Sequence, residues 1–313
     1  MSQLKITIVF GLLLSVAFFV WLLPDEHGFY PVALRRLLGQ VFPERLTPQG
    51  AADKYAAGRL RVLVVPGHDN KYSGAEFGRL KEADLNKALG ERLAYYLAQD
   101  KNLAVFATRD WTTGVYRQEF LDYFTRERAA IHSFRARLRA QFVSLVRSGA
   151  VTEEVIVSHN FAPEEMSLQL YGINKWANEQ GIDLAVHLHF NDYAGRPAGR
   201  RGPYRGFSIY VPERQLPVYR LSKELAEAVK ERLLLESPIS NFPKEDAGII
   251  EDQELIAVGA RGSRDGASFL IEYGYIYESR FTDPARRAVT LDVMARRTAE
   301  GIRNYFAPVV ARR

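Results

Sequence analysis

The segment LRVLVVPGH, residues 60–68, indicates how this chain folds. Its apolar, largely β-branched run stops abruptly at Pro66 and Gly67, which is typical of a buried strand followed by a turn. Strand-like and helix-like segments then alternate along the chain. The further expected strands are residues 103–108, 155–158, 183–189, 206–211, 255–260 and 268–272, and the expected helices are residues 32–38, 81–100, 117–148, 168–180, 221–235 and 284–306. This alternation predicts an α/β fold with a mostly parallel central sheet flanked by helices.

The composition is that of a folded protein and narrows the possible chemistry. With 313 residues, 47% of them hydrophobic, the chain can bury one large core or two small ones. It contains no cysteine, which excludes disulfides, thiolate metal sites and a cysteine nucleophile. The net charge of +5 is spread along the chain without a nucleic-acid motif. It suits an anionic envelope polymer or a solvated basic surface, and we expect no nucleic-acid partner.

The N-terminal run of residues 6–23 is apolar and uncharged, and as a helix it is just long enough to span a membrane. One lysine precedes the run and two acidic residues follow it, so the positive-inside rule places the bulk of the chain outside the cytoplasm. A cleaved signal peptide is the alternative, but the sequence LLPDE that follows is a poor cleavage context. We expect a signal anchor over residues 1–24, a linker over 25–58 and the main domain over 59–313.

Several residues fit for chemistry occur where the expected strands end. In open parallel sheets, ligands bind beyond the carboxyl ends of the strands. The first strand ends at His68, the third at His187 and His189, and Glu82 lies in the first turn of the helix after the first strand. Two histidines and a carboxylate from separate elements form the open arrangement of a catalytic zinc site. Glu272, at the end of another strand, would serve as a proton carrier.

Each of these residues also has a structural interpretation without chemistry. His68 can be an exposed loop residue, and Glu82 can simply complement the helix dipole. His187 and His189 point to the same side of their strand, so one can be a ligand and the other its neighbour, or both can be core histidines. Glu272 is the most informative, because a carboxylate among apolar neighbours is costly to bury unless it is paired.

Four sequence blocks follow one another in an order that is known from one family. They are VVPGH at residues 64–68 with GA at 74–75, EADLN at 82–86, AN at 177–178 with HFN at 189–191, and IEYGY at 271–275. Over residues 60–306 the chain resembles the zinc-dependent N-acetylmuramoyl-L-alanine amidases of cell-wall metabolism. The resemblance implies that His68, Glu82 and His189 bind Zn²⁺ and that Glu272 is the catalytic acid/base, with His187 a neighbour rather than a ligand.

The chain departs from the family pattern at three places. Asp69 and Asn70 replace a glycine pair, which would either alter the mouth of the site or add an acidic contact beside it. An arginine usually found before the Ala-Asn pair is absent. Extra residues between about 111 and 167 form a helical insertion, and the resemblance implies that such a region can cover the active site or receive an activator protein. An elaboration that packs on the sheet edge is the equal alternative.

The segment after the third strand holds further candidates for substrate contacts. Asn191 follows His189, and the loop over residues 196–205 carries four arginines, Arg205 among them. Such arginines can hold substrate carboxylates through bidentate pairs. A solvated basic loop is equally compatible with the pattern.

The resemblance implies hydrolysis of the amide between N-acetylmuramic acid and L-alanine in peptidoglycan. Together with the N-terminal apolar run, this predicts an enzyme anchored to a membrane, with the bulk of the chain in the periplasm or cell envelope. Two alternatives remain. The same residues can cleave another envelope amide, because the pocket loops set specificity and the fold does not. The departures can also mark a peptidoglycan-binding or regulatory pseudoenzyme, although a binding protein has no need of Glu272.

Overall fold

The computed structural model describes residues 46–153 and 162–310, and within them lies a six-stranded sheet. Its order is β4 (Leu103–Ala107), β1 (Leu60–Pro66), β5 (Leu184–Asn191), β8 (Ala267–Tyr275), β6 (Ser208–Pro212) and β7 (Ile249–Asp252). The first four strands are parallel, β6 runs antiparallel to β8, and β7 is parallel to β6. The predicted mostly parallel α/β sheet is confirmed.

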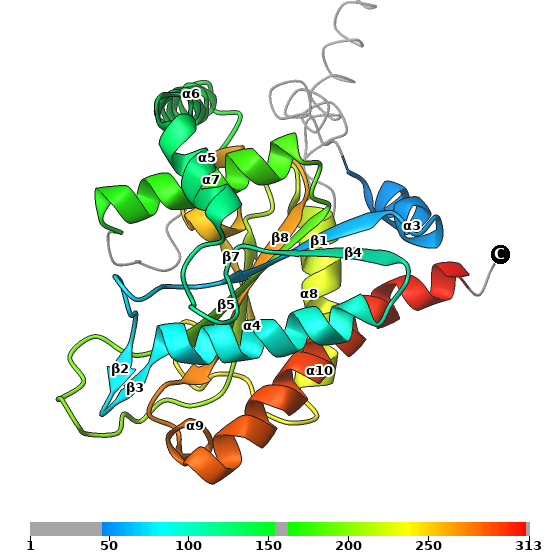
Figure 1. The fold of residues 1–313 in the computed structure, drawn as a ribbon. Coiled ribbons are helices and arrows are strands. Elements are labelled where there is room, and N and C mark those ends of the chain that lie inside the picture. Colours follow the sequence, from blue (N-terminus) through cyan, green and yellow to red (C-terminus); the bar gives the residue numbers. More distant parts are fainter. Residues whose placement is uncertain (1–45, 154–161, 311–313) are drawn as a thin grey trace, which may run out of the picture.

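Three long helices cover one face of the sheet, which we call the first face (Figure 1). They are α4 (Glu82–Ala98), α8 (Tyr219–Leu233) and α10 (Pro284–Val310). Val62 and Val64 of β1 point into this layer and pack with the apolar side of α4. Their neighbours Leu63 and Val65 belong to a different cluster. This alternation follows from the two-residue repeat of a strand, and it means that both faces of the sheet are buried.

The opposite, second face is covered by α5 (Gln118–Arg126), α6 (Arg128–Arg147) and α7 (Glu164–Glu179). Phe120 of α5 is fully buried, and its ring centroid lies 4.5 Å from that of Trp176 in α7. Both pack in one cluster with Leu63 and Val65 of β1. The inserted residues therefore supply part of the hydrophobic core on this face.

Two predicted elements on this side of the molecule are wrong. The expected single helix over residues 117–148 is divided at Glu127, where φ −95° and ψ 10° separate α5 from α6. The expected strand over 255–260 is instead a pair of 3₁₀ turns, Ile256–Val258 and Ala260–Gly262, joined at Gly259 with φ +97°. The segment is apolar because Ala257 and Val258 pack against Leu270, not because it pairs in a sheet.

The structure also contains elements that the sequence patterns did not predict. Within the stretch predicted as a linker, α3 (Pro48–Ala56) packs on the first-face core through Ala51 and Tyr55. Thr47 caps this helix by accepting a hydrogen bond from the Gly50 amide at 3.1 Å. Strand β7 was missed, and a short hairpin of β2 (Glu76–Phe77) and β3 (Leu80–Lys81) precedes α4.

Three other predictions concern residues that the structure does not describe. The apolar run over residues 6–23, the short helix over 32–38 and the strand over 155–158 all lie outside the described ranges. In the parts of the chain that are described, no helix combines the length and the apolar character needed to cross a membrane.

Candidate metal centre

The three residues predicted as metal ligands meet at one end of the sheet. His68 directly follows the turn after β1, and Glu82 is the first residue of α4. His189 lies near the end of β5, the strand that pairs in parallel with β1. Because carboxyl ends of neighbouring parallel strands share an edge, residues 107 positions apart come into direct contact there.

The Glu82 carboxylate lies between the two imidazoles. Its Oε2 atom is 3.3 Å from His68 Nε2, and its Oε1 atom is 2.9 Å from His189 Nδ1. One ligand atom from each of the three residues lies within 4.8 Å of the others, which is a spacing that can hold a metal ion. The histidine side chains are 22% and 18% exposed, whereas that of Glu82 is 5% exposed, so the site opens on the histidine side.

Backbone and amide donors hold the Glu82 carboxylate in place. The Ala75 amide donates to Oε2 at 2.8 Å, and the Phe190 amide donates to Oε1 at 3.1 Å. Asn86, one turn along α4, donates from Nδ2 to Oε1 at 3.3 Å and to the Gly67 carbonyl at 3.0 Å. Burial alone would raise the pKa of Glu82, but the neighbouring histidines and the Ala75 amide outweigh it and lower the pKa to about 2. The residue is therefore an ionised carboxylate, as a metal ligand must be.

Two glycines leave the space that this cluster occupies. A Cβ at Gly67 would lie 2.2 Å from Cε1 of His189. A Cβ at Gly74, which has φ +73°, would lie 2.3 Å from Glu82 Oε2 and 2.6 Å from Cδ2 of His68. His68 itself has φ +59°, a left-handed conformation that costs free energy in a residue other than glycine. Side chains are thus packed around the three ligands as tightly as the backbone permits.

The donor set fits zinc. Two imidazole nitrogens and one carboxylate form the open three-ligand arrangement that leaves a coordination position for water or substrate. Burial lowers the pKa of His68, although the Glu82 carboxylate opposes this, and a neutral imidazole is the form that binds a metal. Asn86 supplies the hydrogen bond from outside the ligand set that orients Glu82.

Glu272 stands beside this cluster on β8. It is in register with His189 on the adjacent strand β5. Its Oε2 atom is buried and, among the described residues, has no hydrogen-bond partner. Burial, together with the negative charges of Glu82 and Glu245, raises the pKa of Glu272 well above its usual range. A carboxyl group of this kind holds a proton at higher pH than an ordinary glutamate, which suits an acid/base role.

Glu245 is a buried carboxylate near the site that sequence reasoning missed. It is 2% exposed and accepts hydrogen bonds from Asn191 Nδ2 at 2.9 Å, the Tyr210 hydroxyl at 2.8 Å and the Tyr275 hydroxyl at 3.1 Å. Asn191, predicted as a substrate contact, is therefore engaged by the protein itself. Glu245 lies in an irregular segment without strand or helix periodicity, so no sequence pattern marked it.

A cavity of about 100 Å³ opens beside the two histidine ligands, and we call it the histidine pocket. The sheet contributes His187, His189 and Leu270, and the turn after β1 contributes His68. The roof comes from α7 and the 3₁₀ segment, through Met166, Gln169, Leu170, Ile173, Leu255 and Ala257. His187 is 1% exposed, and burial lowers its pKa well below the usual range, so it is neutral. It lines the same pocket but stands outside the group of three ligand residues. From the inserted residues, Tyr116 and Met166 also line this pocket.

The arginine-rich loop is more ordered than a free basic loop. Arg196 forms two hydrogen bonds of 2.6 Å with the Asp192 carboxylate and donates to the Glu76 carbonyl at 2.8 Å. This ties the loop to the β2–β3 hairpin at the metal-site end of the sheet (Figure 1). Arg205 is exposed, and its backbone amide donates to Asn241 Oδ1 at 2.7 Å. It does not line the histidine pocket.

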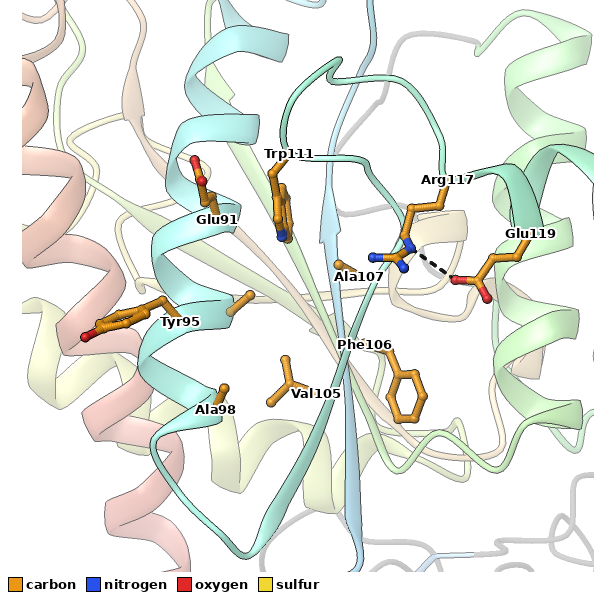
Figure 2. A pocket seen from close by; sticks show the side chains of 10 residues that line it. Glu91, Tyr95, Ala98, Val105, Phe106, Ala107, Trp111, Arg117 and Glu119 are labelled. Atoms are coloured by element: carbon orange, nitrogen blue, oxygen red, sulfur yellow. Dashed lines mark ion pairs between the residues drawn. The ribbon is translucent and has the colours of Figure 1, made fainter.

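A larger hollow of about 580 Å³ lies elsewhere, between α4 and the edge strand β4. Figure 2 shows Trp111 above Val105 and Phe106 of β4, with Tyr95 of α4 at the left and the Arg117–Glu119 ion pair at the right. Its lining contains no histidine. Of these two cavities, only the smaller histidine pocket borders the candidate metal ligands.

Comparisons with known proteins identify the family of the chain and solved structures with a similar fold. The family model described as N-acetylmuramoyl-L-alanine amidase matches residues 62–304. Among solved structures, the CwlD amidase of Clostridioides difficile, determined in complex with the GerS lipoprotein, is similar with a TM-score of 0.53 at 14% identity, covering 80% of this chain and 100% of that one. The amidase AmiC2 of Nostoc punctiforme is similar with a TM-score of 0.47 at 20% identity, covering 79% and 97%. No curated protein sequence matches the chain.

Proposed function

The chain belongs to the N-acetylmuramoyl-L-alanine amidase family, and from this premise we propose that it is a zinc-dependent enzyme that cleaves the amide between N-acetylmuramic acid and L-alanine in peptidoglycan. The observation that carries the proposal is the cluster of His68, Glu82 and His189, with Glu272 in register beside it. Zinc dependence is typical of the family. A peptidoglycan-binding protein without activity would need neither the convergent ligand set nor an unpaired buried carboxyl group.

The mechanism assigns each residue a task. His68, Glu82 and His189 would hold the ion, and Asn86 would orient the Glu82 carboxylate between the imidazoles. A bound zinc ion acidifies a water molecule and polarises a carbonyl group. Glu272 accepts the proton that the attacking water loses and delivers it to the nitrogen of the departing L-alanine. Its raised pKa suits both steps, because the group must take up a proton and release it again within one turnover.

Digestion of purified sacculi with the full-length protein tests the bond specificity. We expect mass spectrometry to find free stem peptides that begin with L-alanine, together with glycan strands whose muramic acid lactyl group carries no peptide. Products cut at another amide would instead establish the related hydrolase, and no soluble product would contradict the enzymatic proposal.

The substitution Glu272→Gln separates proton transfer from metal binding. Glutamine has nearly the same shape but cannot accept a proton, so we expect hydrolysis to fall by a factor of at least ~100. Elemental analysis should still find zinc in the purified variant. Unchanged peptide release by Glu272→Gln would remove Glu272 from its assigned role, and absence of zinc from the wild-type protein would reject the metal site.

We further propose that the enzyme acts outside the cytoplasm, held at a membrane by residues 6–23, because its substrate lies in the cell envelope and the run is apolar and uncharged. The solved relative CwlD was determined with a lipoprotein partner, which supports an activator protein that docks on the inserted helices α5 and α6. A reporter fused to the C-terminus tests the topology, and a cytoplasmic signal would reject the proposed orientation.

A further inference from the structure

Arg109 is a buried cation that touches the chain on both sides of a metal ligand. It follows β4, is 3% exposed, and its Nε atom donates to the Pro66 carbonyl at 3.4 Å. Its Nη1 atom lies 3.6 Å from Asp69 Oδ2. Pro66 and Asp69 bracket His68, so a single guanidinium contacts the backbone before the ligand and the side chain after it.

The bracketed segment needs such support. His68 has φ +59°, a conformation that a residue other than glycine keeps only when its surroundings impose it. Asp69 contributes from the other side, because its Oδ1 atom accepts the amides of Lys71 and Tyr72 at 2.9 and 2.8 Å. Its Oδ2 atom faces Arg109. Both carboxylate oxygens of Asp69 therefore serve to hold the turn in which His68 stands.

Arg109 is held in turn by an aromatic ring from the start of the insertion. Its guanidinium carbon lies 3.4 Å from the centroid of the Tyr116 ring, and the two residues also form a backbone bridge. Tyr116 is 8% exposed and makes an edge contact with Phe124 of α5, at a centroid distance of 5.1 Å. A Cβ added at Gly172 of α7 would lie 2.9 Å from Phe124, which shows how closely these helices pack.

These contacts form a continuous path from the inserted helices to the metal ligand. We propose that Arg109 is a positioning residue that fixes His68 through its contacts with Pro66 and Asp69, and we call these two contacts the clamp. Tyr116 couples the clamp to the inserted helix α5. The proposal rests on the metal site of the proposed function. It differs from a lid, because the insertion acts on the position of a ligand through Arg109, although Arg109, Tyr116 and Met166 also line the histidine pocket.

The charges support a clamp that works as a unit. A guanidinium this deeply buried is costly unless an opposite charge and hydrogen bonds compensate it. Asp69 supplies the opposite charge as an ion pair at 3.6 Å, although Nη1 forms no hydrogen bond with any described residue, and Asp69 stands where the resemblance expects glycine. Removing the charge of Arg109 or of Asp69 alone leaves the other charge without its partner. Removing both charges leaves no unpaired charge behind. In the double variant, the loss of zinc affinity should therefore be smaller than the product of the losses caused by Arg109→Gln and Asp69→Asn alone.

Hydrogen exchange in the metal-free, full-length protein tests the clamp without depending on zinc. We expect Arg109→Gln to increase amide exchange in the segment 67–75 by about tenfold or more, since the Asp69 amide donates to the Tyr72 carbonyl within it. Tyr116→Ala should raise exchange in the same segment, and Tyr116→Phe, which keeps the ring, should not. Arg117→Gln changes an exposed arginine of the same turn and is the matched control.

Zinc affinity, measured by chelator competition, is the second readout. Loss of a group that positions a metal ligand typically lowers affinity by about 10–100-fold, and we expect this for Arg109→Gln, with a smaller loss for Tyr116→Ala. Tyr116→Phe and Arg117→Gln should match the wild-type protein. Should Arg109→Gln fail to fold, Tyr116→Ala and Asp69→Asn carry both measurements.

Three outcomes would contradict the clamp, and a fourth would contradict the proposed function. The clamp would be overturned if Arg109→Gln showed the same amide exchange in residues 67–75 as the wild-type protein. It would also be overturned if Tyr116→Phe and Tyr116→Ala raised that exchange equally. A multiplied loss in the Arg109→Gln, Asp69→Asn double variant would show that the two residues act independently. A wild-type protein that binds no zinc would reject the proposed function, while the exchange result would still decide whether the clamp exists.

Discussion

The two faces of the sheet are covered by helices that are held in different ways. On the first face, α8 and α10 approach so closely that a Cβ at Gly301 would lie 2.5 Å from the Val229 Cα atom. On the second face, α6 and α7 are joined near their outer surface by ion pairs, Arg135 with Glu164 at 2.6 Å and Arg128 with Glu165 at 3.0 Å. On the first face, the backbone of α10 packs against the backbone of α8. On the second face, α6 and α7 contact each other through their side chains.

This difference separates two parts of the site. The first face carries α4, whose first residue is the ligand candidate Glu82, held by amide donors of the backbone and of Asn86. The second face carries α7, whose side chains roof the histidine pocket. Adaptable packing is suited to a surface that must accept substrate, whereas a metal site requires fixed geometry.

The largest effect is expected at the metal cluster itself. Gly74→Ala would place a methyl group 2.3 Å from Glu82 Oε2, so the carboxylate or the hairpin must move. We expect zinc affinity to fall by about 100-fold or more, and hydrolysis with it. Chelator competition with the purified protein measures the affinity.

Gly78→Ala is the matched control for that change. Gly78 lies four residues further on, in the turn between β2 and β3, and also has a positive φ, +61°, but an added Cβ meets nothing within 4 Å. Its cost should be limited to backbone strain of ~1–2 kcal/mol, with zinc affinity retained. Equal loss of zinc in both variants would show that turn strain, not the space around the ligands, controls the site.

A pair of helix glycines sharpens the comparison of the two faces. Gly301→Ala meets the Val229 Cα and the Ala228 carbonyl, which cannot move alone, and we expect a loss of ~1–3 kcal/mol in the free energy of unfolding. For Gly172→Ala on the second face, the three nearest atoms are side-chain atoms of Phe124 and Ile131. There the gain in helix propensity should offset the crowding, leaving stability nearly unchanged. Urea unfolding measures both, and a larger loss in Gly172→Ala would reverse our description of the faces.

The smallest effect is expected from the ion pair between α6 and α7. Glu164 is well exposed, so Glu164→Gln should leave the melting temperature almost unchanged despite the short contact with Arg135. The apolar Leu138 and Phe142 of α6 hold the helices together instead. Differential scanning calorimetry at low and high salt checks this, and a substantial, salt-dependent drop would mean that charges hold the second face.

The sequence predicted the parts of this molecule whose patterns are local. Strand β1, helix α4 and the positions of β5 and β8 follow from runs of apolar residues and their stops, although β8 continues beyond its expected end at Glu272 to Tyr275. The second face was predicted less well: the break at Glu127 has neither glycine nor proline to mark it, and the segment 255–260 is apolar for tertiary reasons. The three ligand candidates were found because each lies at, or within two residues of, the end of a strand or the start of a helix.

The supporting residues could not be found in the same way. Arg109 and Glu245 act through contacts with residues distant in sequence, and a buried arginine or glutamate looks in sequence like any exposed one. The antiparallel pairing of β6 with β8 likewise could not be predicted from the sequence, because strand order and direction depend on the path of the connections. Local pattern therefore identified the residues for chemistry, and only the fold identified those that hold them.

The ligands are spaced unevenly along the chain, and this affects assembly. His68 and Glu82 come from one hairpin-containing segment, whereas His189 arrives 107 positions after Glu82, on the neighbouring strand. An ion bound by all three acts as a reversible cross-link that closes this long loop. It can form fully only after β5 has paired with β1, and it then resists their separation. Metal capture would thus be a late event in folding, and the loaded protein would unfold more slowly than the empty one.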